Sequence, residues 1–153
     1  MIRYARMGDV KEIHSLINYY ARQGLLLPCS LSSLYDRLRD FVVHVHRDDS
    51  IIGVCALHIT WENLAEIRSL AVREGNRGQR IGAELVRQCL VEADMLGIAK
   101  VFTLTYQPGF FHKQGFHDID KRELPHKIWS DCINCHMFPD CDEEALMYDR
   151  QKS

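Results

Sequence analysis

The residues best suited to chemistry surround a polar turn near the middle of the chain. The glycines and basic residues of this turn are Gly75, Gly78, Arg73, Arg77 and Arg80. A glycine turn that leads into a helix presents unpaired backbone N–H groups at the positive end of the helix dipole. Such a place binds phosphate without any particular side chain, and nearby arginines add to its affinity for anions. The pattern therefore predicts an anion site, with a tight connection carrying exposed arginines as the alternative.

The turn joins a predicted strand to a predicted helix. Ile67, Leu70 and Val72 suit a half-buried strand before the turn. After the turn, apolar residues recur at helical spacing: Ile81, Leu85, Cys89, Leu90, Ala93 and Leu96. Gly97 is well placed to end this helix. The sequence has neither G-x-x-x-x-G-K-[ST] nor a G-x-G-x-x-G after a strand, which excludes the common nucleotide-binding loops.

Residues 77–82, Arg-Gly-Gln-Arg-Ile-Gly, resemble the acyl-CoA-binding motif [RQ]-x-x-G-x-[GA] of the GNAT superfamily of N-acetyltransferases. Arg80 stands where the motif has its middle glycine. We expect the backbone at Arg80 to avoid any conformation that only glycine tolerates. Residues 100–105, a predicted strand, and residues 110–116, which resemble the short helix and Gly-Phe ending of the family, follow in the family's order. The resemblance covers roughly the whole chain.

The resemblance implies an α+β fold, in which helices flank a mostly antiparallel sheet with splayed central strands. We expect residues 1–153 to form one domain of this kind. The patterns predict strands at 2–5, 41–46, 51–59 and around 144–148. They also predict a helix that Asp9 and Glu12 begin as a capping box, and a second helix capped by Ser30. The apolar face of the first helix holds Val10, Ile13, Leu16, Ile17 and Tyr20.

Acetyl-CoA is the cosubstrate that the resemblance implies. In the family, exposed N–H groups of the splayed strand hold the pantetheine arm and the acetyl oxygen, and here Leu70, Ala71 and Val72 match that stretch. The turn and the first helical turn correspond to the pyrophosphate site. Its residues are Arg77, Gly78, Gln79, Arg80, Ile81, Gly82 and Ala83.

Attack of an amine on a thioester needs a general base. Glu66 is our candidate, because strict alternation along the strand places it on one face with Arg68, Leu70 and Val72. A carboxylate can also reach the amine through a water. In the alternative interpretation Glu66 only pairs with a basic side chain such as Arg68. His58 is a competing candidate for the base.

The departing thiolate needs a proton or a hydrogen bond. Many family members use a tyrosine four residues before the glycine of Gly-Phe, and this position is Phe111 here. The role therefore passes to Thr105 or Tyr106 at the end of the facing strand, or to water. Tyr106 could equally be a packing residue.

Residues 23–28 and 65–72 resemble the acetyltransferase domain of bacterial N-acetylglutamate synthases, including short forms without a kinase domain. The resemblance implies acetylation of the α-amine of an amino acid such as glutamate, a step of arginine biosynthesis. An arginine is common after the first helix in that family, but Cys29 and its neighbours stand there. Arg37, Arg39 and Arg68 are candidate replacements for gripping a carboxylate. A peptide N-terminus as acceptor, and an acyl-CoA sensor without turnover, are the alternatives.

Composition limits the remaining partners. The formal net charge of −2 argues against nucleic acid. No apolar run reaches membrane-spanning length, and the chain opens in a strand pattern, so we expect a cytoplasmic protein with no membrane partner. A homodimer is expected only by analogy with the family.

Five of the six cysteines fall into two groups. Cys55 and Cys89 fit small buried hydrophobic residues. Cys132, Cys135 and Cys141 have a spacing that could hold a metal together with His136 or His126. We expect no resident metal, with plain reduced thiols favoured in a cytosolic protein and a disulfide as a further alternative.

Overall fold

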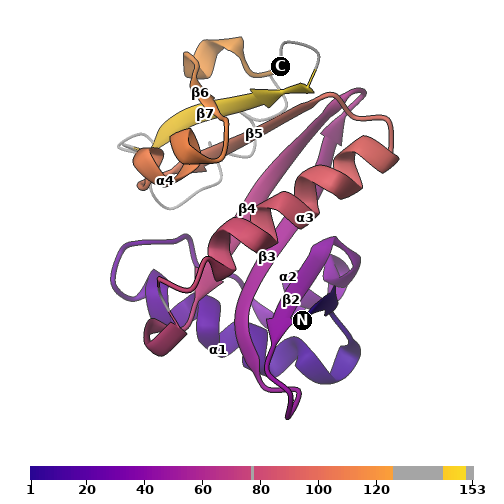
Figure 1. Ribbon diagram of the computed structural model, residues 1–153, viewed down its shortest axis with the longest axis vertical. Coiled ribbons are helices and arrows are strands. Elements are labelled where there is room, and N and C mark those ends of the chain that lie inside the picture. Colours follow the sequence, from indigo (N-terminus) through magenta and orange to yellow (C-terminus); the bar gives the residue numbers. More distant parts are fainter. Residues whose placement is uncertain (77, 126–142, 151–153) are drawn as a thin grey trace.

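The computed structural model describes residues 1–76, 78–125 and 143–150. Within these residues a seven-stranded sheet has the order β1-β2-β3-β4-β5-β7-β6 (Figure 1). Its strands are β1 (Ile2–Tyr4), β2 (Phe41–Val45), β3 (Ile51–Trp61), β4 (Leu64–Val72), β5 (Lys100–Thr105), β6 (His117–Asp118) and β7 (Glu144–Asp149). The β4–β5 pair is parallel and the other pairs are antiparallel. The expected α+β class with a mostly antiparallel sheet is confirmed.

Helices cover both faces of the sheet. They are α1 (Val10–Ala21), α2 (Leu31–Asp36), α3 (Ile81–Met95) and α4 (Pro108–Lys113), with short 3-10 turns η1 (Met7–Asp9), η2 (Leu38–Asp40), η3 (Glu74–Asn76) and η4 (Lys121–Glu123). Successive residues of β3 pack on opposite faces of the sheet, against different helices. Cys55 packs in the core cluster of α3, whereas Val54 and Ala56 pack in that of α1. Figure 1 shows α3 crossing in front of β3 and β4, with α1 on the other side.

Several local predictions are confirmed. The five apolar residues expected on one face of α1 are all buried: Val10, Ile13, Leu16, Ile17 and Tyr20. Ser30 caps α2, since its hydroxyl accepts from the Ser33 N–H at 3.1 Å. Gly97 follows α3 with φ +80°, as a helix-ending glycine should.

The predicted capping box of α1 is wrong. The Asp9 carboxylate accepts instead from the Arg6 N–H at 2.7 Å and pairs with Arg3, because the turn η1 precedes the helix and takes the acid as its own partner. The Glu12 carboxylate accepts from the Ile51 N–H at 2.9 Å and pairs with Arg73 at 3.0 Å. Long-range partners thus replace the local one, and Glu12 fastens α1 to β3.

The predicted alternation along β4 is also wrong. Ala56 faces Arg68 but Val54 faces Ala71, so β4 has one extra residue in this stretch, a β-bulge. Ser69 lies within it with φ +57°. As a result Ile67 and Leu70 pack on the α3 side, whereas Glu66, which alternates with Ala65 and Ile67, leaves the opposite side of the strand. Glu66 and Arg68 therefore do not share a face with Leu70 and Val72.

Arg80 differs from expectation as well. Its backbone has φ +61° and ψ 17°, within the left-handed region that favours glycine. An L-residue occupies this region at a cost of about 1 to 2 kcal/mol. The position thus keeps the backbone shape that a glycine would give, and α3 begins at the next residue.

Close packing of α3 on β3 gives a first prediction. A Cβ at Gly53 would lie 2.9 Å from both Ile81 Cγ2 and Leu85 Cδ1, at the start of α3. Gly53→Ala should lower the free energy of unfolding by about 1 to 2 kcal/mol through overpacking. Urea denaturation measures this. Gly8→Ala is the matched control, since its Cβ would meet nothing within 4 Å, and an equal loss in both variants would contradict the packing argument.

Candidate active site

The site is built where two neighbouring strands part. The ladder between β4 and β5 runs from Leu64–Lys100 to Ile67–Thr103, and the Thr103 hydroxyl donates to the Ile67 carbonyl at 3.1 Å. Among the described residues the pairing ends there, although β4 continues to Val72. The backbone of residues 68–72 therefore borders a gap on its β5 side. This is the splay that the resemblance implied.

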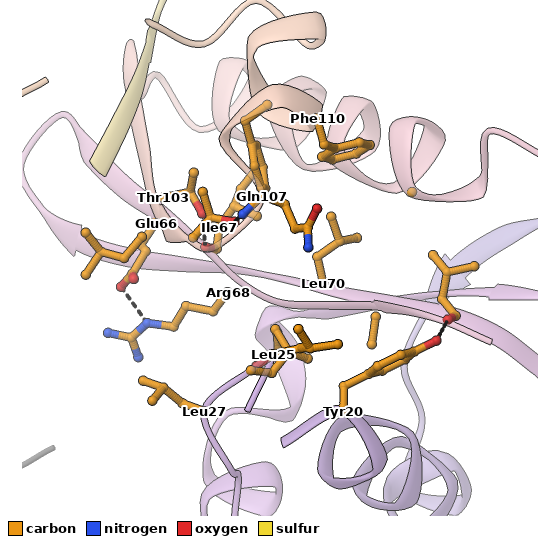
Figure 2. Close-up of a pocket in the computed structure, with 18 of the residues that line it drawn as sticks. Tyr20, Leu25, Leu27, Glu66, Ile67, Arg68, Leu70, Thr103, Gln107 and Phe110 are labelled. Atoms are coloured by element: carbon orange, nitrogen blue, oxygen red, sulfur yellow. Dashed lines mark hydrogen bonds and ion pairs between the residues drawn. The ribbon is translucent and has the colours of Figure 1, made fainter. Parts of the chain in front are cut away.

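A cavity of about 1690 Å³ occupies this gap. It exceeds the roughly 300 to 1,000 Å³ of common small-molecule pockets, so it has room for a long cofactor and a second ligand. The α1–α2 loop, β4, the start of α3, the end of β5 and α4 all contribute to its wall. Figure 2 shows Leu25, Leu27 and Tyr20 on one side of β4, and Gln107 and Phe110 on the other.

The side toward α3 holds most residues expected to bind the cofactor. Those lining the cavity are Leu70, Ala71, Val72, Gly78, Arg80, Ile81, Gly82 and Ala83. The bond from the Glu84 N–H to the Arg80 carbonyl, at 3.0 Å, opens α3, so the N–H groups of residues 81–83 precede the helical ladder. Gln79 lies outside the lining formed by the described residues, and Arg77 lies outside the described residues themselves.

The side toward α1 carries the candidate base. Glu66 lines the cavity, is 8% exposed, and accepts from Arg68 Nε at 2.5 Å (Figure 2). Tyr20 bounds the same space, and its hydroxyl donates to the Val72 carbonyl. The structure thus places the carboxylate beside the opened strand edge and also gives it the arginine partner named in the alternative.

Two arginines line the cavity together with Cys29. Arg37 and Arg68 both line the cavity, and Arg39 lies outside the lining that the described residues form. Burial raises the pKa of the Cys29 thiol, and the charges of Arg37 and Arg68 oppose that rise. Of the three arginines considered as carboxylate partners, these two border the cavity.

The candidate acids differ in position. Thr105 lines the cavity, and its Oγ1 accepts a hydrogen bond from the Gln107 N–H at 2.8 Å. A hydroxyl that accepts one bond can still donate its own proton to another partner. Tyr106 is outside the lining drawn from the described residues. Phe111 is 3% exposed and packs edge-on against Phe116 with ring centroids 5.2 Å apart. Position therefore favours Thr105 as the hydroxyl beside the thiolate.

Glu143 is a site residue that the sequence analysis missed. It lines the cavity, is 8% exposed, and precedes Glu144, the strand partner of Thr105. The acidic run at 142–144 was visible in the sequence. Nothing in that run says which carboxylate turns inward, because the turn depends on how β7 pairs with β5.

The cysteines expected to be apolar are buried. Cys55 and Cys89 are both 0% exposed with their sulfurs 3.7 Å apart. Cys132, Cys135 and Cys141, with His126 and His136, lie outside the described residues. In the part of the chain that the structure describes, no cluster of three His, Cys, Asp or Glu residues is suited to a metal ion. Among the same residues, none of the helices has the length and apolar character needed to cross a membrane.

A sheet that opens beside a helix start, with a carboxylate on the other side of the opened strand, defines a class of enzymes that transfer acyl groups from CoA. Residues 9–117 match the Acetyltransferase (GNAT) family. The chain therefore belongs to the GNAT family, and it is an acetyl-CoA-dependent N-acetyltransferase. The fold, cosubstrate and class of reaction expected from the resemblance are thus confirmed.

Relatives agree with this assignment. The chain is 38% identical over 146 residues to an uncharacterized N-acetyltransferase of Chlorobaculum tepidum, covering 95% of this chain and 94% of that one. It is 34% identical over 133 residues to an amino-acid acetyltransferase of Mycobacterium tuberculosis, covering 86% and 76%. N-acetylglutamate synthase from Neisseria gonorrhoeae, solved with coenzyme A and N-acetyl-glutamate, superimposes with a TM-score of 0.89 at 27% identity. That match covers 97% of this chain and 34% of the synthase.

The environment of Cys29 gives a second prediction. Because burial raises its pKa, the thiol stays protonated at neutral pH, and the reactive thiolate becomes abundant only above the ordinary range of a cysteine. Alkylation of Cys29 by iodoacetamide should be slower than that of free cysteine at pH 8 and should rise about tenfold per pH unit. Mass spectrometry of the Cys29 peptide follows the rate. Alkylation at pH 7 as fast as at pH 9 would contradict this prediction.

Proposed function

We propose that the acceptor is the α-amine of a carboxylate-bearing amino acid, with glutamate as the first candidate. The observation that carries this proposal is the presence of two arginines, Arg37 and Arg68, in the wall of the cavity. Guanidinium groups bind carboxylates with paired, charge-assisted hydrogen bonds. The names of the relatives support the same class, because one is an amino-acid acetyltransferase and another was solved with N-acetyl-glutamate.

The two halves of the cavity take separate tasks in this proposal. The start of α3 holds the pyrophosphate of acetyl-CoA, and the edge of β4 from Leu70 to Val72 holds the pantetheine arm and the acetyl oxygen. The acceptor enters from the side of the α1–α2 loop. Both substrates then meet across β4, so the reaction is a direct transfer in a ternary complex.

Proton transfer precedes the attack. The acceptor arrives as an ammonium ion, and Glu66 takes one proton directly or through a water. The nitrogen lone pair then forms the bond to the acetyl carbon, and the bond from that carbon to sulfur breaks. The thiolate that leaves receives a hydrogen bond from Thr105, and the second amine proton ends on the sulfur. The products are the N-acetyl amino acid and CoA.

The decisive assay measures thiol release from acetyl-CoA with a panel of amines. The proposal expects turnover with glutamate or another amino acid that has a free α-carboxylate, and much less with the matching amino-acid amide. Turnover with peptide N-termini alone would assign the protein to peptide acetylation. Tight binding of acetyl-CoA without release from any amine would make it a sensor, and either result would overturn the proposal.

Arg37 gives a prediction with a close control. Arg37→Ala should raise the KM of the amino acid about ten- to a hundredfold, the effect of losing one charged hydrogen-bond partner, and leave the KM of acetyl-CoA unchanged. Arg39→Ala is the control, since this arginine lies two residues away and, among the described residues, outside the cavity wall. Equal effects in both variants, measured by initial rates, would remove Arg37 from acceptor binding.

Glu66 gives a prediction for the chemical step. Glu66→Gln keeps the shape and a hydrogen-bond acceptor for Arg68 but cannot take a proton. We expect kcat to fall about a hundredfold or more, which is the usual contribution of a general base. Calorimetry should show nearly unchanged affinity for acetyl-CoA. An unchanged kcat would leave Glu66 as a structural partner of Arg68.

A further inference from the structure

A second pair of ionisable groups lies beside the candidate base and has no part in the mechanism above. His58 lies on β3, and Asp40 ends the turn η2. The distance from His58 Nδ1 to Asp40 Oδ2 is 2.8 Å. Their side chains are 26% and 25% exposed, so both reach solvent while staying partly enclosed.

The register of the sheet sets His58 next to Glu66. The two residues are direct cross-strand partners in the antiparallel β3–β4 ladder. Such partners leave the sheet on the same face with their Cβ atoms about 4.5 to 5.5 Å apart. The position of the bulge matters here, because it begins after the Ala56–Arg68 pair and leaves the His58–Glu66 pair in regular register.

The contact with Asp40 defines what His58 can do. An ionised carboxylate only accepts hydrogen bonds, so the proton of a neutral imidazole must lie on Nδ1. Nε2 then carries the lone pair and can accept a proton. When it does so, the negative Asp40 stabilises the imidazolium that forms. A carboxylate holds the histidine of a proton-transfer triad in the same way.

Other charged groups near the pair come from two elements. Glu66 faces His58 from β4, and Arg68 lies two residues further along that strand, opposite Ala56. Glu92 of α3 lies near Asp40. Burial raises the pKa of Glu92, and the negative charge of Asp40 adds to that rise.

We propose that His58, held by Asp40, carries the acceptor's proton from Glu66 to solvent. This proposal rests on the proposed function and deepens it. Glu66 takes one proton from the ammonium group and passes it to Nε2 of His58. The imidazolium loses that proton to water at its exposed side, which restores both residues for the next turnover. The Glu66 side chain is 10% exposed and that of His58 is 26% exposed, so the histidine has better access to solvent.

The test removes the imidazole of His58 by mutation and then adds free imidazole to the assay. His58→Ala should lower kcat about tenfold and leave the KM of acetyl-CoA within twofold. Added imidazole at fixed pH should restore much of the lost kcat, with little effect on the wild-type enzyme. His117→Ala, an exposed histidine of β6, is the control and should behave like wild type. A role in folding alone would not respond to imidazole.

Asp40→Asn keeps the histidine and provides an independent variant if His58→Ala does not fold. It should also lower kcat, and the double variant should be no slower than His58→Ala, because the pair acts as one unit. A wild-type kcat in the folded single variants, or additive losses without imidazole rescue, would overturn the relay.

If none of the amino acids tested causes the wild-type enzyme to release thiol from acetyl-CoA, the proposed function itself fails. If it is active and Glu66→Gln is inactive while His58→Ala is unaffected, only the relay fails.

Discussion

The structure depends on one constraint, the early end of pairing between β4 and β5. β4 pairs with β3 from Leu64 to Val72, apart from the bulge at Ser69 and a second irregularity near Trp61, but it leaves β5 after the Ile67–Thr103 pair. Backbone N–H and C=O groups seldom stay unpaired in a protein interior, so an opened strand edge calls for a ligand or water. The cavity of about 1690 Å³ lies along this edge. The unpaired part of β4 thus forms a binding surface long enough for an extended molecule.

The bulge at Ser69 makes the two sides of that edge chemically different. Before it, Glu66 points away from α3, and after it, Leu70 packs toward α3. One strand therefore carries charged groups on one side and an apolar, amide-bearing edge on the other. Contacts far along the chain hold this strand in place. Tyr20 of α1 bonds the Val72 carbonyl, and the start of α3 packs against Gly53 of β3.

The sequence was sufficient where periodicity decides structure. The buried faces of α1 and α3, the strand at residues 100–105 and the start of α3 all follow from spacing and turn residues. It was insufficient where contacts between residues far apart in the sequence determine the local structure. Glu12 bonds Ile51 instead of capping its own helix, Ser69 adds a residue that strict alternation cannot reveal, and Glu143 turns inward only because β7 pairs with β5. Glu66, predicted as the base, lines the cavity, but the face that it was predicted to share with Leu70 and Val72 was wrong.

The charges on the acceptor side also bear on whether the chain catalyses or only senses acyl-CoA. A module that merely bound CoA would need the α3 side of the cavity, with its helix start and strand edge. Here the opposite side holds Glu66, only 8% exposed, against Arg68. Enclosed ion pairs add little stability compared with apolar side chains of equal size, because desolvation offsets their attraction. The place of such a pair beside a large cavity accords with a site for a second substrate, which catalysis requires and sensing does not.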